Sequence, residues 1–153
     1  MSKPESMFDL KSRVEFIYGD IIDQFNLSLV SSSENSLVLN SGSLDLVINS
    51  QMGELDMSIL VNGYSRPINP LLWGYIIKGI DYRDVIPVRA DPSMKLVEHV
   101  TLRLNEEKTY LALFCKDLLS HDFSQVSLYF DKLHDFMIEF NSYHEMRRQS
   151  EGN

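Results

Sequence analysis

Apolar and polar residues alternate along the stretch from Asn26 to Asn62, and this alternation constrains the fold more than any other feature. A period of two places successive side chains on opposite faces of a β-strand, so one face of a sheet packs on a core. The predicted core positions are Leu27, Leu29, Leu37, Leu39, Leu44, Leu46, Ile48, Leu55, Met57, Ile59 and Val61. Short gaps rich in Ser, Asn and Gly separate the strands, which predicts an antiparallel meander of three or four strands.

The opposite face of this predicted sheet mixes polar and small apolar side chains. Its members are Asn26, Ser28, Ser36, Asn40, Asp45, Asn49, Glu54, Asp56 and Asn62, with Val30, Val38, Val47 and Leu60 among them. Such a mixture suits a protein interface, and it equally suits partial cover by a later helix. The sequence leaves both alternatives open.

The same region carries the most one-sided charge of the chain. No Lys or Arg occurs from Val14 to Ser65, where seven acidic residues supply −7 of the chain's net −8. An acidic surface repels the phosphate backbone of nucleic acids and attracts basic proteins. We therefore expect a basic protein partner and no nucleic-acid partner. The predicted partner-binding residues are Asp45, Glu54, Asp56, Asp20, Asp23 and Glu34.

Helical spacing flanks the strands on both sides. Ser6 is the predicted N-cap of a first helix. The apolar positions of this helix are Leu10, Val14, Ile17, Ile21 and Phe25, and Gly19 weakens it slightly. After the strands, Asn69-Pro70 predicts the start of a short helix that Gly79 closes. This helix is apolar on nearly every side, so we expect Trp73 to be largely buried.

Two further stretches have helical spacing beyond a predicted loop or short helical turn at 81–89. Asp91-Pro92 predicts the N-cap of a helix. The polar run 105–108 predicts a kink or break near Asn105, so the sequence leaves open whether residues 92–120 form one helix or two. A last helix is predicted from Phe123 to about Met146, followed by a frayed tail from Gln149 to Asn153.

These patterns predict an α+β fold in a single domain spanning residues 1–153, with an ordered core from about 6 to 148. An N-terminal helix precedes the antiparallel three- or four-stranded meander, and the C-terminal helices pack on one face. The single cysteine, Cys115, cannot form an internal disulfide and suits a buried position in a reduced compartment. The chain lacks the apolar block of a signal peptide and any run of about 18 apolar residues, so we expect a cytoplasmic protein without membrane contact.

Histidines and carboxylates on the predicted C-terminal helices form the best candidate metal site. Asp131, His134 and Asp135 share one helical face, and Asp117 and His121 lie on the preceding predicted helix. The Glu-x-x-His pairs of di-iron bundles are absent, and no third well-supported ligand completes a zinc site. We therefore predict no metal and no cofactor, and interpret Asp131, Asp135 and Glu139 as a solvated acidic stripe.

Motifs for covalent or nucleotide chemistry are also missing. The chain contains no G-x-S-x-G elbow, no P-loop and no G-x-G-x-x-G, and Cys115 lacks an electropositive setting. Glu54 and Asp56 share a strand face about 7 Å apart, a pairing that glycoside hydrolysis requires. The sequence shows no apolar surroundings for either carboxyl that would set an acid and a base apart, so a non-enzymatic protein is the prediction and a hydrolase the third alternative.

The order of elements resembles the small immunity proteins that bacteria make alongside polymorphic or contact-dependent growth inhibition toxins. Many of them open with a helix, continue into a meander and finish with helices, and their last hairpin reads like residues 53–59, Gly-Glu-Leu-Asp-Met-Ser-Ile. The resemblance covers residues 7–62 in pattern. It implies a non-catalytic protein that binds a cognate toxin, commonly a cationic nuclease, in a 1:1 complex. The alternative is a regulatory or assembly adaptor that binds a basic host protein.

Overall fold

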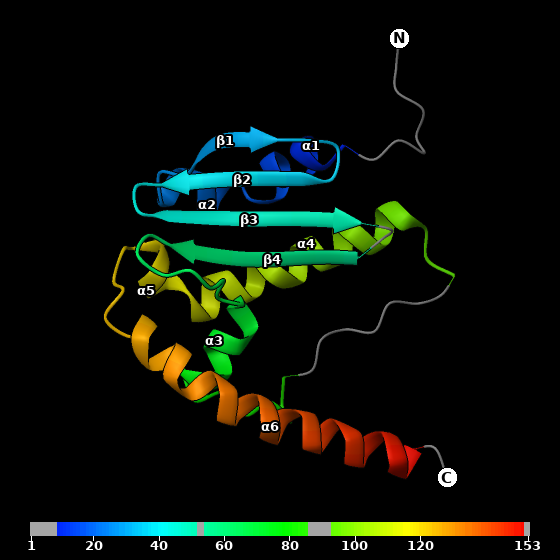
Figure 1. Ribbon diagram of the computed structural model, residues 1–153. Helices are drawn as coiled ribbons and strands as arrows, with labels where there is room; N and C mark the ends of the chain where they lie inside the picture. The colour runs from blue at the N-terminus through cyan, green and yellow to red at the C-terminus, as the bar shows by residue number, and fades with distance from the viewer. Residues whose placement is uncertain (1–8, 52–53, 86–92, 152–153) are drawn as a thin grey trace.

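The computed structural model describes residues 9–51, 54–85 and 93–151, which form an α+β fold with a four-stranded antiparallel sheet (Figure 1). The strands are β1 (Ser28–Ser32), β2 (Ser36–Ser41), β3 (Leu44–Gln51) and β4 (Glu54–Val61). They lie side by side in chain order, each antiparallel to the next. The predicted meander and fold class are therefore confirmed.

The predicted alternation is confirmed in β2, β3 and β4, where every second side chain is buried except Leu55 at the start of β4, which is half-buried. The edge strand β1 departs from it, because the register shifts between Leu29 and Ser31 and all five residues are exposed. Leu29 is 40% exposed, so its predicted core position is wrong. A bulge on an edge strand bends the strand away from its neighbour and lifts its side chains off the core.

The buried face of the sheet packs against α1 (Leu10–Ile17), α2 (Gly19–Gln24) and α4 (Leu96–Phe114), which lie behind the strands in Figure 1. Buried side chains from these helices and from the sheet form one hydrophobic cluster. The edge of β4 is extended by Ile68, whose backbone exchanges two hydrogen bonds of 2.8 Å with Ile59.

The N-terminal helical region differs from the single helix that we predicted. It is divided at Tyr18 between α1 and α2, and the hydroxyl of Tyr18 donates to the carbonyl of Leu104 at 2.6 Å. This buried anchor and the low helix propensity of Gly19 explain the division. The observed N-cap is Asp9, whose side chain accepts from Ser12 N, whereas the predicted cap Ser6 lies outside the described residues.

Helix α3 (Pro70–Ile76) begins as predicted. Asn69 Oδ1 accepts hydrogen bonds from the N–H groups of Leu71 and Leu72, and Gly79 follows the helix in the left-handed region at φ 71°. Trp73 has no exposed surface, which confirms its predicted burial.

The predicted break near Asn105 is wrong, because α4 runs without interruption to Phe114. The Asn105 side chain donates to the carbonyl of Thr101, and Arg103 forms an ion pair with Glu106 at 2.8 Å. The polar run consists mostly of good helix formers, so it continues the helix. The observed N-cap is Lys95, and the predicted Asp91-Pro92 cap lies outside the part of the chain that the structure describes.

The helical conformation is interrupted instead at Cys115 (φ −113°, ψ 17°), which separates α4 from the short helix α5 (Lys116–Leu119). His121 lies beyond α5 in a turn at φ 65°, so its predicted place on a helix is wrong. Helix α6 (Val126–Glu151) starts three residues later than predicted and continues through Gln149 and Ser150, which we expected to fray. It runs below the sheet in Figure 1.

Candidate protein-binding face

Among the described elements, no helix crosses the face of the sheet that is turned toward the viewer in Figure 1. We call this surface the open face. It carries the side chains that alternate with the buried ones: Ser36, Val38, Asn40, Asp45, Val47, Asn49, Gln51, Glu54, Asp56, Ser58 and Leu60. The alternative in which a later helix covers this face is therefore wrong for the described helices, and the protein interface stays a prediction.

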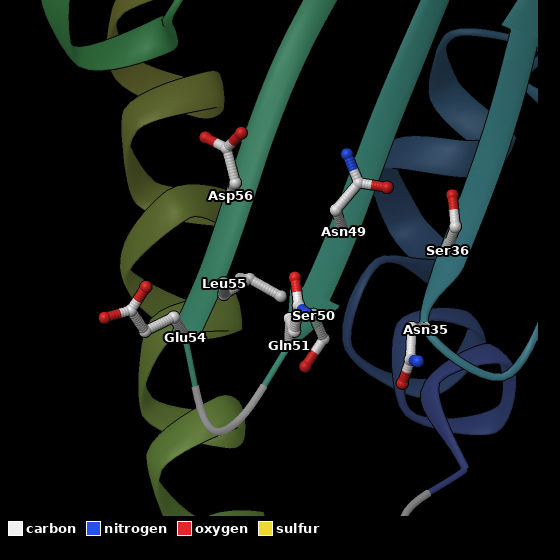
Figure 2. A pocket seen from close by; sticks show the side chains of 8 residues that line it. All are labelled: Asn35, Ser36, Asn49, Ser50, Gln51, Glu54, Leu55 and Asp56. Atoms are coloured by element: carbon white, nitrogen blue, oxygen red, sulfur yellow. The ribbon is translucent and has the colours of Figure 1, made fainter.

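Side chains from three strands line a hollow of about 740 Å³ at the end of the sheet where β4 begins (Figure 2). Asp56 is paired across the strands with Asn49, which is paired in turn with Ser36. Glu54 is paired with Gln51 at the end of the same hairpin. The hollow therefore combines two exposed carboxylates with side-chain amides and two serine hydroxyls, a set that can accept hydrogen bonds from a polar partner and donate hydrogen bonds to it.

The structure brings together only some of the six predicted partner-binding residues. Asp45, Glu54 and Asp56 share the open face, and Glu34 lies in the exposed turn between β1 and β2. Asp20 and Asp23 lie on α2, behind the sheet. A partner that covers the open face therefore meets three or four of the six carboxylates, and Asp20 and Asp23 face another direction.

Two acidic residues that seemed to lack basic partners in the sequence have them in the structure. Lys108 from α4 lies 3.0 Å from Asp20, and this hydrogen bond holds the pKa of the Asp20 carboxyl below its usual range. Lys11 lies 3.7 Å from Glu15, one helical turn away. No described basic residue forms an ion pair with Asp45, Glu54 or Asp56.

Asp45 differs from the other two carboxylates of the open face because its neighbours hold it in place. Its side chain is half-buried, and its Oδ1 accepts a hydrogen bond of 2.7 Å from Asn40 Nδ2. The same amide nitrogen donates to the carbonyls of Gly42 and Leu44 in the β2–β3 turn. Asp45 therefore supports the hairpin as well as carrying charge.

The rival surface is the acidic stripe on α6. Asp131, Asp135 and Glu139 are all exposed, and Glu139 accepts a long hydrogen bond of 3.4 Å from the hydroxyl of Tyr82. The stripe is thus a solvated helix surface, as interpreted from the sequence. Its three carboxylates lie along one helix, whereas Glu54 and Asp56 of the open face border a hollow.

The residues considered for metal binding are separated in the fold. Asp117 forms an ion pair of 3.1 Å with Lys78, and His121 makes a hydrogen bond with Ser41. Across the described ranges, no three His, Cys, Asp or Glu side chains are grouped as ligands for a metal ion. Cys115 is buried, and burial raises the pKa of its thiol. No helix in the described part of the chain has the length and apolar character needed to cross a bilayer.

Glu107 lies on α4, which packs against β4 below the open face. Burial, together with the nearby charges of Glu106 and Asp56, raises the pKa of its carboxyl to about 7. Its Oε2 atom is buried without a hydrogen-bond partner among the described residues. An acidic residue beneath the open face therefore changes its charge near neutral pH.

Sequence reasoning did not single out the amides that complete the hollow. Asn35 and Gln51 occupy predicted turns, and Asn49 was only one polar position of a strand face. Their convergence depends on the strand register, which pairs residue 49 with both 36 and 56. The short turn at Gly42 fixes the pairing of β2 with β3, so counting residues outward from this turn would have placed Asn49 opposite Ser36.

Comparison of the chain with protein families, with curated proteins and with solved structures found no significant match.

Proposed function

We propose that this protein is a non-catalytic, cytoplasmic binding module that receives a basic protein on its open face. The observation that carries the proposal is the group of three carboxylates, Asp45, Glu54 and Asp56, on a sheet face that no described helix covers. Uncompensated carboxylates on one face attract a basic surface over several ångströms and orient its approach.

The chemistry of the open face fits a protein partner better than a small substrate. Val38, Val47 and Leu60 supply apolar area between the polar residues, and Asn49 and Gln51 offer amides for hydrogen bonds. Protein interfaces combine apolar area with a polar rim in this way. Lys or Arg side chains of the partner would make charge-assisted hydrogen bonds with Glu54 and Asp56.

The specific function that we propose is immunity against a toxin, most simply a nuclease. A nuclease must present a basic surface to the phosphate backbone of its substrate. An acidic sheet bound to that surface competes with the nucleic acid and blocks access without any chemical step. The resemblance of residues 7–62 to immunity proteins supports this choice.

The test is co-expression of the protein with the C-terminal domain of a toxin encoded by a neighbouring gene. We expect rescued growth and a 1:1 complex that shows no turnover. A double variant with Glu54→Lys and Asp56→Lys should abolish the rescue of growth. A double variant with Asp131→Lys and Asp135→Lys should leave the rescue intact. The opposite result would move the interface to α6, and a stable complex with a basic protein that has no toxic activity would favour the adaptor alternative.

A further inference from the structure

A second hollow, of about 440 Å³, is lined by side chains of α3 and α6 together with Asn69 and Tyr82. Both helices lie below the sheet in Figure 1 and are not part of the open face. Its apolar lining includes Leu71 and Leu72 of α3 and Met137 of α6. Aromatic rings of Tyr75, Tyr82 and Phe140 complete it. We call this hollow the aromatic pocket. Its volume is within the range of about 300–1,000 Å³ that small-molecule sites occupy.

The walls of the aromatic pocket are held in place by contacts that need no ligand. The Phe140 ring lies 6.1 Å from the Tyr75 ring and 5.6 Å from the Tyr82 ring, measured between centroids. The Tyr75 hydroxyl donates to the carbonyl of Val85 at 2.6 Å. A preformed site loses little conformational entropy when a ligand binds, so less of the free energy of its contacts is offset by ordering of side chains.

The pocket-facing side of α6 is apolar, yet it remains only half covered. Beyond Tyr129, no residue of the helix through Ser150 is fully buried, although Met137 and Phe140 are large apolar side chains. Apolar surface that remains accessible in a concave site favours a ligand that removes it from water.

The pocket has few polar groups: besides the tyrosine hydroxyls, they are the side-chain amide of Asn69 and the imidazole of His144. Asn69 Oδ1 is used by the first turn of α3, and no described group accepts a hydrogen bond from its amide nitrogen. The His144 ring lies edge-on to Phe140 at 4.2 Å, and no hydrogen bond involves its nitrogens within the described ranges. Both residues line the pocket, and none of its lining residues is an Asp, Glu, Lys or Arg.

From this geometry we propose that the aromatic pocket binds an uncharged, planar aromatic small molecule that carries a hydrogen-bond acceptor. The rings of Tyr82 and Phe140 contact the flat face of the ligand, and the amide nitrogen of Asn69 donates to its acceptor. An ionised ligand would lose its hydration without meeting an Asp, Glu, Lys or Arg in the lining. The site is independent of the proposed partner on the open face.

The test uses three probes that share a naphthalene ring and differ in charge: 2-naphthamide, 2-naphthoate and 2-naphthylmethylammonium. Titration of the full-length protein is followed by NMR of the methyl groups of Leu71, Leu72 and Met137. We expect 2-naphthamide to shift these signals with a Kd on the order of 1 mM or tighter. The two charged probes should bind at least several-fold more weakly.

Leu72→Trp fills the pocket and should weaken binding of 2-naphthamide about tenfold or more, with Met137→Phe as a second filling variant if the first does not fold. Ile138→Trp is the matched control on α6, because Ile138 is 56% exposed and does not line the pocket. The proposal is overturned if 2-naphthamide causes no shifts or binds the filled variants equally well. Tighter binding of 2-naphthoate than of 2-naphthamide would also overturn the proposal. So would changes of the methyl NMR signals with protein concentration alone, because they would identify a second copy of the chain as the occupant.

Discussion

The Oγ atom of Ser41 and the Nε2 atom of His121 lie 3.1 Å apart, which joins the end of β2 to the turn after α5. Ser41 also donates its hydroxyl proton to the carbonyl of Phe25 at 2.9 Å, so it accepts the hydrogen bond from His121. A serine whose proton is engaged elsewhere is not poised for transfer to the histidine. The pair is therefore a structural link between three segments rather than a nucleophile and its base.

This link should contribute measurably to stability. We expect a double-mutant cycle of Ser41→Ala and His121→Ala to give a coupling free energy of about 0.5–1.5 kcal/mol, the range for one partly buried hydrogen bond. Urea denaturation of the four proteins measures it. His134→Ala, at an exposed position of α6, is the control and should change stability by less than about 0.5 kcal/mol. Additive single-mutant effects would contradict the link.

Glu107 should make stability fall as pH rises toward neutrality. Its folded pKa of about 7 lies above the ordinary value of 4.5, so the folded state holds the proton more tightly. The stabilisation is complete below about pH 4.5 and is lost as pH rises through 7. Glu107→Gln keeps the shape and stays neutral, so it should be more stable than the unmodified protein at pH 8 by on the order of 3 kcal/mol. Equal pH profiles for the two proteins would refute the assignment.

Two glycines should respond in opposite ways to the same substitution. A Cβ on Gly74 would lie 2.5 Å from the Phe114 ring, where α3 packs on α4, so Gly74→Ala should destabilise by about 1–3 kcal/mol. Gly19 begins α2 and a Cβ there would meet nothing within 4 Å. Gly19→Ala should therefore be neutral or stabilise by up to about 1 kcal/mol. Thermal unfolding of both variants compares them directly.

The carboxylates of the open face should differ in their effects on folding. Glu54→Lys and Asp56→Lys change exposed residues and should each alter stability by less than about 0.5 kcal/mol. Asp45→Lys removes the acceptor of Asn40 and should cost about 1 kcal/mol or more. Asp45→Asn retains an oxygen acceptor and is the control. Equal urea midpoints for all four variants would show that the Asn40 contact contributes nothing.

Association with the basic partner should depend strongly on salt. Raising the ionic strength from about 50 to 200 mM shortens the range of electrostatic attraction, so the on-rate should fall while the off-rate changes less. In the variant with both Glu54→Lys and Asp56→Lys, the salt dependence of the on-rate should be much flatter. Stopped-flow mixing measures both rates. An unchanged salt dependence in that variant would exclude Glu54 and Asp56 from the encounter.

Local sequence pattern was sufficient for the features that depend on residues close in the chain. The period of two predicted β2, β3 and β4 because successive side chains of each strand point alternately toward the core and toward solvent. Asn69-Pro70 predicted the start of α3 because a cap and its first turn lie within four residues. The same local signals were misleading at Asn105, where a polar run proved compatible with a continuous helix.

Tertiary structure alone decided which surfaces stay open and which charges are paired. Lys108 reaches Asp20 from 88 positions away, and His121 reaches Ser41 across 80, contacts that no local pattern specifies. Periodicity shows that a strand has two faces, but the packing direction of later helices determines which of them remains uncovered. The sequence by itself therefore determined the strands and the charge they carry. The packing of α1, α2 and α4 on one side of the sheet turned Asp45, Glu54 and Asp56 into an accessible acidic face, because only one side of a four-stranded sheet was needed to complete the core.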